Sequence, residues 1–405
     1  MDSKLIKKIS EDSARWVDEG IITQDARERI IERYRKQGEL EQKAGPGKLI
    51  STLSVMGAVL VGVGVVLFVS SNWKEMARWS KFCVLFFPML ACYAAGWWLR
   101  HGRANFPKVG AALMLLGSII YGAAIFLVAQ MFNISVHYPN GILMWWAAIL
   151  PLAYLTGLVP ILVLSLGCML TWLGTEASFW IYEYEPFSYV GLYMMAGLLL
   201  WKVGTLHERV DGKVSESFVK VYLALGLVVV CITFFICTND DFLDIYTFNK
   251  SVGEPLRPVV FLLAIAAPVA CIAAWNLARG ARGATYKVEA AVVIALLALA
   301  GYLGYSFTGS SKLNLDYYYV GANVLYLLFI ITLIVIGYYR RMPVYFNVGL
   351  LFFVVLVTAR YFDMFWDLMP RSVFFMAGGV LMITGGVILE RQRRRVIASF
   401  GGGAL

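Results

Sequence analysis

The sequence predicts an all-α protein, a polytopic transmembrane helical bundle with a short cytoplasmic N-terminal helical hairpin. Of its 405 residues, 60% are hydrophobic and 15% are charged, whereas soluble domains carry about 45–50% apolar and about 25% charged residues. Apolar runs of the roughly 20 residues that a membrane-spanning helix needs recur along the chain. The short alternating apolar and polar strands of a membrane β-barrel do not occur. The composition therefore fits a protein whose solvent is lipid.

The apolar runs predict about twelve membrane spans. They begin near Leu49, Phe82, Val109, Ile142, Val159, Ser188, Phe218, Leu256, Val288, Tyr318, Val344 and Ser372. Because Gly157 and Pro160 break helices, the stretch from Ile142 to Thr175 is expected to form two short spans.

Three regions follow from this pattern: a soluble cytoplasmic αα-hairpin and linker at 1–47, a transmembrane domain at 48–390 and a basic cytoplasmic tail at 391–405. Gly20 is suited to end the first helix of the hairpin, and Thr23 to cap the second. No cleavable signal peptide is expected, since the first apolar run starts after a charged segment. A hairpin of this size buries little core, so we expect it to dock on the membrane domain, on a second copy or on a protein partner.

Lysine and arginine positions predict the orientation, because cytoplasmic loops retain these residues. A cytoplasmic N-terminus and an even number of spans place most of them inside, including Lys202, Arg340 and the arginines of the tail. Lys74, Arg78 and Lys81 are the exception. This pattern predicts a multi-pass protein of the inner (plasma) membrane with both termini cytoplasmic. The net charge of +9 is spread over short loops, so it does not indicate nucleic-acid binding.

Charged side chains within an apolar run are the first candidates for a functional site, because unpaired burial is costly in a membrane. Arg360, Asp363 and Asp367 are spaced i, i+3 and i+7, which places them on one helical face near the expected outer boundary. One interpretation is an ion-pair cluster that locks two helix ends together. The other is a substrate-anion or proton-coupling role.

A second polar stretch, residues 121–141, contains Gln130, Asn133 and His137. Its "AQMFN" has the same layout as "ARYFD" around Arg360, which indicates either internal duplication or convergent interface chemistry. If the two elements pack together, they form an outer polar pocket. Deeper polar residues either line an approach to that pocket or make helix–helix hydrogen bonds; they are Tyr121, Tyr305, Asn323 and Asn347.

Enzyme signals are weak. The sequence contains no phosphate-binding loop, no HExxH, no nucleophile elbow and no paired-cysteine metal motif. The six cysteines fall in predicted spans, where a free thiol behaves as a small apolar residue. We therefore predict no catalytic residue, no metal and no cofactor.

Three motifs resemble a prokaryotic family of predicted inner-membrane proteins that is catalogued as domain of unknown function 2157. They are "DEGIITQDARERI", "GVGVVLFVSSNWKEM" and "GAAIFLVAQMFNI", which cover roughly the first third of the chain. The later "TARYFDMF" and "RRR" are also similar but less diagnostic. The resemblance implies a membrane location and assigns neither an activity nor a site residue.

Two main functions remain open at this stage, with a membrane-embedded enzyme as a third. The first hypothesis is a transporter or flippase-like carrier of a small polar or lipid-linked molecule, which requires a polar cavity that reaches the bilayer midplane. The alternative is a non-transporting scaffold or envelope sensor that acts through the N-terminal hairpin. A scaffold should have a sealed apolar core.

Overall fold

The computed structural model describes residues 76–102, 107–134, 137–179, 186–208, 213–239, 284–306, 315–366 and 370–401, with short pieces between residues 12 and 32 and at residues 71, 266, 269 and 270. These residues form helices and turns, and no strand occurs among them. The chain divides into two compact units, Met1–Cys83 and Val84–Leu405.

The first unit contains the turn that the sequence predicts at Gly20. Gly20 has a φ of +72°, a left-handed conformation that glycine adopts without steric cost. The amide of Ile21 donates to the carbonyl of Trp16 at 2.9 Å, which closes the preceding helix. The hydroxyl oxygen of Thr23 then accepts a hydrogen bond from the Ala26 amide at 3.3 Å. Both local predictions, the glycine stop and the threonine cap, are confirmed.

Ten described helices coincide with ten of the predicted apolar runs. They are α4 Arg78–Trp97, continued by a π-helical segment Trp98–Gly102, α5 Pro107–Met131, α6 Pro139–Thr156, α7 Val159–Ala177, α8 Pro186–His207, α9 Lys213–Ile236, α12 Ala284–Ser306, α13 Leu315–Tyr339, α14 Pro343–Phe365 and α15 Arg371–Gly401. The runs that begin near Leu49 and Leu256 lie outside the described residues.

The break between α6 and α7 lies where the sequence predicts it. Gly157 follows α6 with a φ of +63°, and its amide donates to the carbonyl of Ala153. Pro160 lies in the first turn of α7, where its missing amide proton leaves no helical hydrogen bond unmade. The two helices pack against each other as an antiparallel pair.

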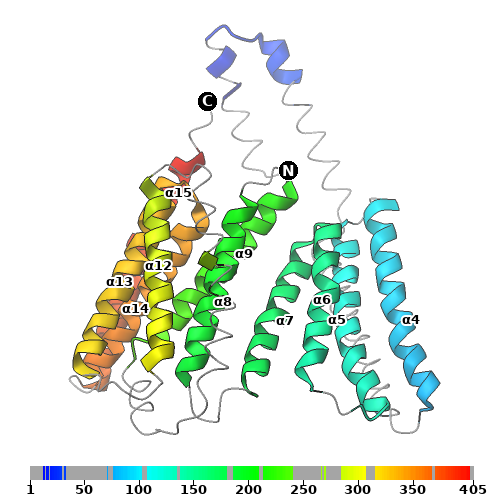
Figure 1. The fold of residues 1–405 in the computed structure, drawn as a ribbon. Helices are drawn as coiled ribbons and strands as arrows, with labels where there is room; N and C mark the ends of the chain where they lie inside the picture. Colours follow the sequence, from blue (N-terminus) through cyan, green and yellow to red (C-terminus); the bar gives the residue numbers. More distant parts are fainter. Residues whose placement is uncertain are drawn as a thin grey trace. The chain divides into compact units, whose positions relative to one another are not determined.

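Small residues bring consecutive helices into close contact. A Cβ atom on Gly226 of α9 would lie 2.5 Å from the backbone nitrogen of Trp201 and 2.8 Å from the carbonyl oxygen of Gly197, both in α8. In the same way, Gly337 of α13 faces the backbone of Phe346 in α14. In Figure 1, α8 and α9 lie between α5, α6 and α7 on one side and α12, α13 and α14 on the other. Close glycine contacts are typical of helix packing in membranes.

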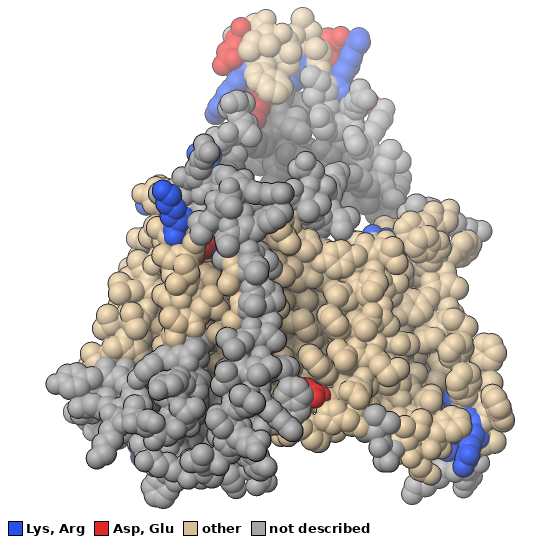
Figure 2. Space-filling model, viewed as in Figure 1, with Lys and Arg blue, Asp and Glu red and all other residues tan. Residues whose placement is uncertain are grey.

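Eight helices among the described residues are long and apolar enough to cross a membrane. Many of their outward side chains are apolar: Ile383 of α15 is 70% exposed and Leu351 of α14 is 55% exposed. Figure 2 shows that the described surface over the helices is almost free of charge on the face in view. A lipid-facing surface has this character, because charged groups are costly in the hydrocarbon region.

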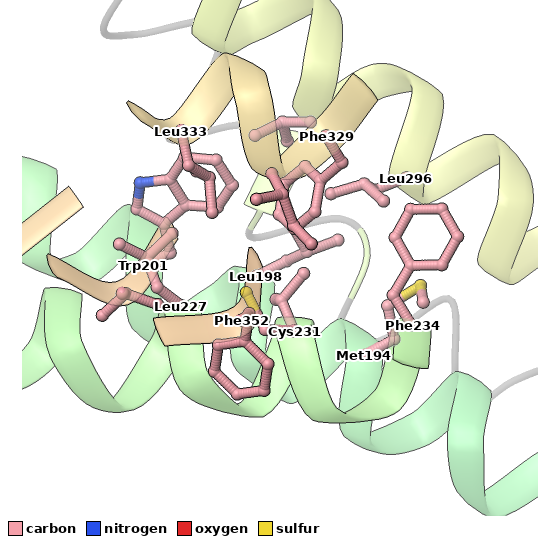
Figure 3. Close-up of a cluster of buried hydrophobic side chains, with 14 of the residues drawn as sticks. Met194, Leu198, Trp201, Leu227, Cys231, Phe234, Leu296, Phe329, Leu333 and Phe352 are labelled. Atoms are coloured by element: carbon pink, nitrogen blue, oxygen red, sulfur yellow. The ribbon is translucent and has the colours of Figure 1, made fainter. Parts of the chain in front are cut away.

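The largest core cluster lies among α8, α9, α12, α13 and α14. Figure 3 shows Leu198, Cys231, Phe329 and Leu333 directed toward one another from these helices. The side chains are at most 5% exposed. The centre of this part of the bundle is therefore packed with apolar groups.

Candidate functional site

Four charged residues meet inside the bundle and form what we call the charge cluster. They are Lys202 of α8, Glu208 just after α8, Glu289 of α12 and Arg340 just after α13. Their side chains are between 3% and 15% exposed. We call this end of the bundle, where α8 and α13 end and α12 and α14 begin, the Arg340 end.

The charges alternate in sign along the cluster. The ammonium of Lys202 contacts Oε1 of Glu289, and Oε2 of Glu289 lies 2.7 Å from Nη1 of Arg340. The other guanidinium nitrogen of Arg340, Nη2, lies 2.6 Å from Oε2 of Glu208. Glu289 therefore contacts two cations, whereas Glu208 contacts one.

Two aromatic residues hold the cluster from α8 and α14. The indole nitrogen of Trp201 donates to the hydroxyl of Tyr345 at 2.8 Å, and Nη1 of Arg340 donates to the same oxygen at 3.3 Å. The guanidinium of Arg340 also lies over the Tyr345 ring at 5.5 Å, and the ammonium of Lys202 over the Trp201 ring at 5.1 Å. Such cation–π contacts stabilise desolvated cations.

Two cations and two carboxylates give the ionised cluster a net charge of zero, which lowers the cost of its burial. Oε1 of Glu208 is nevertheless buried without a hydrogen-bond partner. Burial raises the pKa of Glu208 above its usual range, although the guanidinium of Arg340 acts to lower it. Glu208 follows the apolar span Tyr189–His207, so this carboxylate lies at the end of a span.

Arg360 forms a second polar cluster at the opposite end, which we call the Arg360 end. Nη1 donates to the Tyr319 hydroxyl at 2.5 Å and lies 3.0 Å from Oδ2 of Asp363. Nη2 donates to Oδ1 of Asn239 at 3.1 Å and to the hydroxyl of Thr238 at 3.4 Å. These contacts join the C-terminal part of α14 to the end of α9 and the beginning of α13. The predicted pairing of Arg360 with Asp363 is confirmed, while Asp367 lies outside the described residues.

Gln130 and Asn133 lie at the end of α5, a helix that packs against α6 and α7. Asn133 has a φ of +49°, and the amide of Ile134 donates to the carbonyl of Ala129 at 2.9 Å. Asn133 therefore ends a helix, whereas Asp363 lies within α14. The two similar five-residue motifs thus have different local structures. Figure 1 shows α5 and α14 on opposite sides of α8 and α9.

His137 contacts a carboxylate at a site separate from the Arg360 cluster. Its Nε2 lies 2.8 Å from Oε2 of Glu176, in the last turn of α7. The ring of Phe179 lies 4.3 Å from the imidazole. The structure therefore places His137 in a separate polar contact between the α5–α6 connection and α7.

The deeper candidate residues have ordinary structural contacts where they are described. The amide nitrogen of Asn323 donates to the carbonyls of Thr238 and Tyr319, and Oδ1 of Asn347 accepts from Arg393 of α15 at 2.8 Å. Tyr121 packs against the core cluster of α5, α6 and α7. The side chain of Tyr305 lies outside the described residues.

Sequence reasoning missed the charge cluster. The lysine and arginine pattern assigns Lys202 and Arg340 to inner loops. In the structure, however, α8 continues past Lys202 to His207, and the Lys202 side chain is buried. The sequence did contain a signal for this pair. Glu289 and Lys202 both lie inside apolar runs, and each is near the end of a span that the predicted orientation places on the same side of the membrane. Opposite charges at equal depth on one side of a bundle indicate a pair.

Helices with apolar outer faces and paired interior charges define a multi-pass integral membrane protein. Residues 14–162 match a family described as "Predicted membrane protein (DUF2157)", and over these residues the family resemblance of the sequence is confirmed. No curated protein and no solved structure was found to match the chain. The described residues contain no group of three or more potential metal ligands.

Proposed function

We propose that this protein is a non-transporting membrane scaffold or envelope sensor that acts through residues 1–47. The observation that carries the proposal is the packed apolar interior between the Arg340 end and the Arg360 end. A carrier of a polar solute needs polar groups at the bilayer midplane, where the solute exchanges its hydration shell for protein contacts.

Between the two polar clusters, the described helices direct mainly apolar side chains toward the core, and Oδ1 of Asn323, near the Arg360 end, is buried without a hydrogen-bond partner. Leu198, Phe329 and Leu333 fill it from α8 and α13, and Phe352 adds a ring from α14. The hydroxyl of Tyr326 is satisfied by the carbonyl of Cys231 at 3.0 Å. This packing supports a scaffold over a carrier.

The N-terminal unit supports the proposal with exposed apolar side chains. Trp16, in a short helical piece, is 40% exposed, and Ile21, in the bend that follows, is 66% exposed. Apolar groups of this kind on a small soluble segment are suited to a protein partner or to self-association.

The proposed topology has about twelve spans in a cell's inner membrane, with both termini in the cytoplasm. The asymmetry of lysine and arginine supports this orientation. The contact between Glu208, just after α8, and Arg340, just after α13, also fits it, because the orientation requires these two helices to end on the same side.

Cysteine accessibility tests the sealed interior. Cys231 is fully buried in the C-terminal half of α9, and its carbonyl accepts from Tyr326 near the middle of α13, so a variant that retains only this cysteine reports on solvent within the core of the bundle. We expect no reaction with a water-soluble, membrane-impermeant maleimide in native membranes, and complete reaction after denaturation. The control variant carries Asn140→Cys as its single cysteine, at an exposed position in the first turn of α6. Reaction of Cys231 in folded protein would overturn the proposal.

A carrier is the second candidate, favoured by one observation. α13 and α14 have a polar cluster near each end, Arg340 with Tyr345 at one and Arg360 with Tyr319 at the other. Clusters at both ends of the same helices could act as two gates. In that case Cys231 should become reactive in a fraction of the molecules, and Arg360→Ala should abolish solute movement at normal protein abundance.

A further inference from the structure

The two carboxylates of the charge cluster both contact the guanidinium of Arg340, but they differ in their number of cationic partners. Glu289 contacts both Lys202 and Arg340, and its side chain is 3% exposed. Glu208 contacts Arg340 alone, and its second oxygen is buried without a partner. Two carboxylates beside one guanidinium repel each other, so the less well-held one is the first to take up a proton.

We propose that Glu208 is a proton-binding site at the Arg340 end of the bundle, loaded from the adjacent aqueous phase. The proton comes from solvent water and forms an O–H bond on the carboxyl group of Glu208. No other covalent bond is made or broken. The inference concerns the charge cluster alone, so it holds for a scaffold and for a carrier.

Glu208 lies nearer to solvent than Glu289. The residue follows the last turn of α8, and its side chain is 15% exposed, whereas Glu289 lies six residues into α12 at 3%. The described charged and titratable groups that act on it are Lys202 in α8, Glu289 in α12, Arg340 just after α13 and Tyr345 in α14. Desolvation of Glu208 favours its neutral form, as does the nearby Glu289.

Protonation has a defined consequence for the cluster. Two cations and two carboxylates sum to zero, whereas two cations and one carboxylate leave a charge of +1. Arg340 then keeps Glu289 as its anionic partner, and the ion pair between the end of α8 and the end of α13 is lost, while the desolvation cost of the Glu208 carboxylate is relieved. The Arg340 end thereby becomes responsive to pH on its own side of the membrane.

Infrared difference spectroscopy tests the proposal on the full-length protein in lipid, because a protonated carboxylic acid has its own carbonyl stretch. A pH titration of the wild type should show this band with a midpoint above the usual glutamate range. Glu208→Gln should remove the band, whereas Glu216→Gln, which alters an exposed glutamate paired with Lys220, should leave it unchanged. A folded Glu208→Gln protein that keeps the same band would overturn the proposal.

A second variant keeps the test decisive if Glu208→Gln does not fold. Glu289→Gln removes the neighbouring negative charge and leaves Arg340 to Glu208, so the midpoint of the band should move to lower pH. The double variant Lys202→Met/Glu289→Gln retains a neutral Arg340–Glu208 pair and should shift the midpoint in the same direction. Elution as a single gel-filtration peak verifies folding. An unmoved midpoint in folded protein would contradict the assignment to Glu208.

Discussion

The indole nitrogen of Trp201 donates a hydrogen bond to the hydroxyl oxygen of Tyr345 at 2.8 Å, across 144 positions of sequence. Both side chains are fully buried. This bond connects α8 to α14 directly beside the charge cluster, so it links the centre of the bundle to the charges at the Arg340 end.

Tyr345→Phe should destabilise the protein by about 1–3 kcal/mol, because it leaves the buried indole N–H of Trp201 without an acceptor. It also removes the oxygen that accepts from Arg340. Thermal unfolding in detergent measures the effect. The matched control is Tyr339→Phe, because Tyr339 is the last residue of α13 and is 70% exposed. Equal unfolding temperatures for the two variants would contradict the structural role of the bond.

Gly226→Ala tests the close contact between α8 and α9. Alanine normally stabilises a helix relative to glycine by about 1 kcal/mol. Here its Cβ would lie 2.5 Å from the Trp201 backbone nitrogen, so the helices must move apart, at a cost of about 1–3 kcal/mol. Gly321→Ala in α13 is the control, since no atom lies within 4 Å of its added Cβ. The unfolding temperature should fall for Gly226→Ala and stay constant or rise for Gly321→Ala.

Much of the fold could be predicted from the sequence, because membrane helices are specified by local composition. The break at Gly157 and Pro160 and the stop at Gly20 depend only on backbone preferences of those residues. The pairing of Arg360 with Asp363 follows from helical spacing alone.

The charge cluster could not be derived in the same way, since it depends on contacts between residues far apart in sequence. Lys202 and Glu289 are 87 positions apart, and Arg340 and Glu208 are 132 apart. Which helix faces pack together is decided by side-chain shape and by close contacts such as that of Gly226 with Trp201. Periodicity alone does not determine these. The expected neighbourhood of Gln130 and Arg360 rested on a five-residue similarity, which carries no information about packing.

Arg360→Ala should lower stability through the loss of its bonds to Tyr319 and Asn239, by about 2–3 kcal/mol for a charged hydrogen-bonding group that is largely buried. Asp363→Asn should cost below about 1 kcal/mol, because Asp363 is half exposed and such ion pairs contribute little. Protein abundance in membranes and the unfolding temperature should both decrease for Arg360→Ala. Unchanged stability of that variant would indicate that Arg360 is not a structural lock.

The pH dependence of stability should change in Glu208→Gln. The pKa of Glu208 is raised in the folded protein by burial, so the folded state binds its proton more tightly than the unfolded chain. This contribution to stability is fully present below the ordinary glutamate pKa and is lost as pH rises through the higher folded value. Relative to Glu208→Gln, the wild type should therefore lose stability as pH increases over that window. Parallel stability curves for the two proteins would contradict the prediction.

Paired substitution tests whether Lys202 and Glu289 stabilise each other. Glu289→Gln leaves two cations with one carboxylate, a net charge of +1, and should cost about 3–5 kcal/mol as a broken buried pair. Lys202→Met in the same chain restores neutrality, so the double variant should be more stable than Glu289→Gln alone. The same cycle on the exposed pair Glu216 and Lys220, which are 72% and 60% exposed, should give a much weaker coupling, because solvent screens such pairs. If the double variant is instead less stable than both Glu289→Gln and Lys202→Met alone, the charge balance of the cluster does not govern its burial.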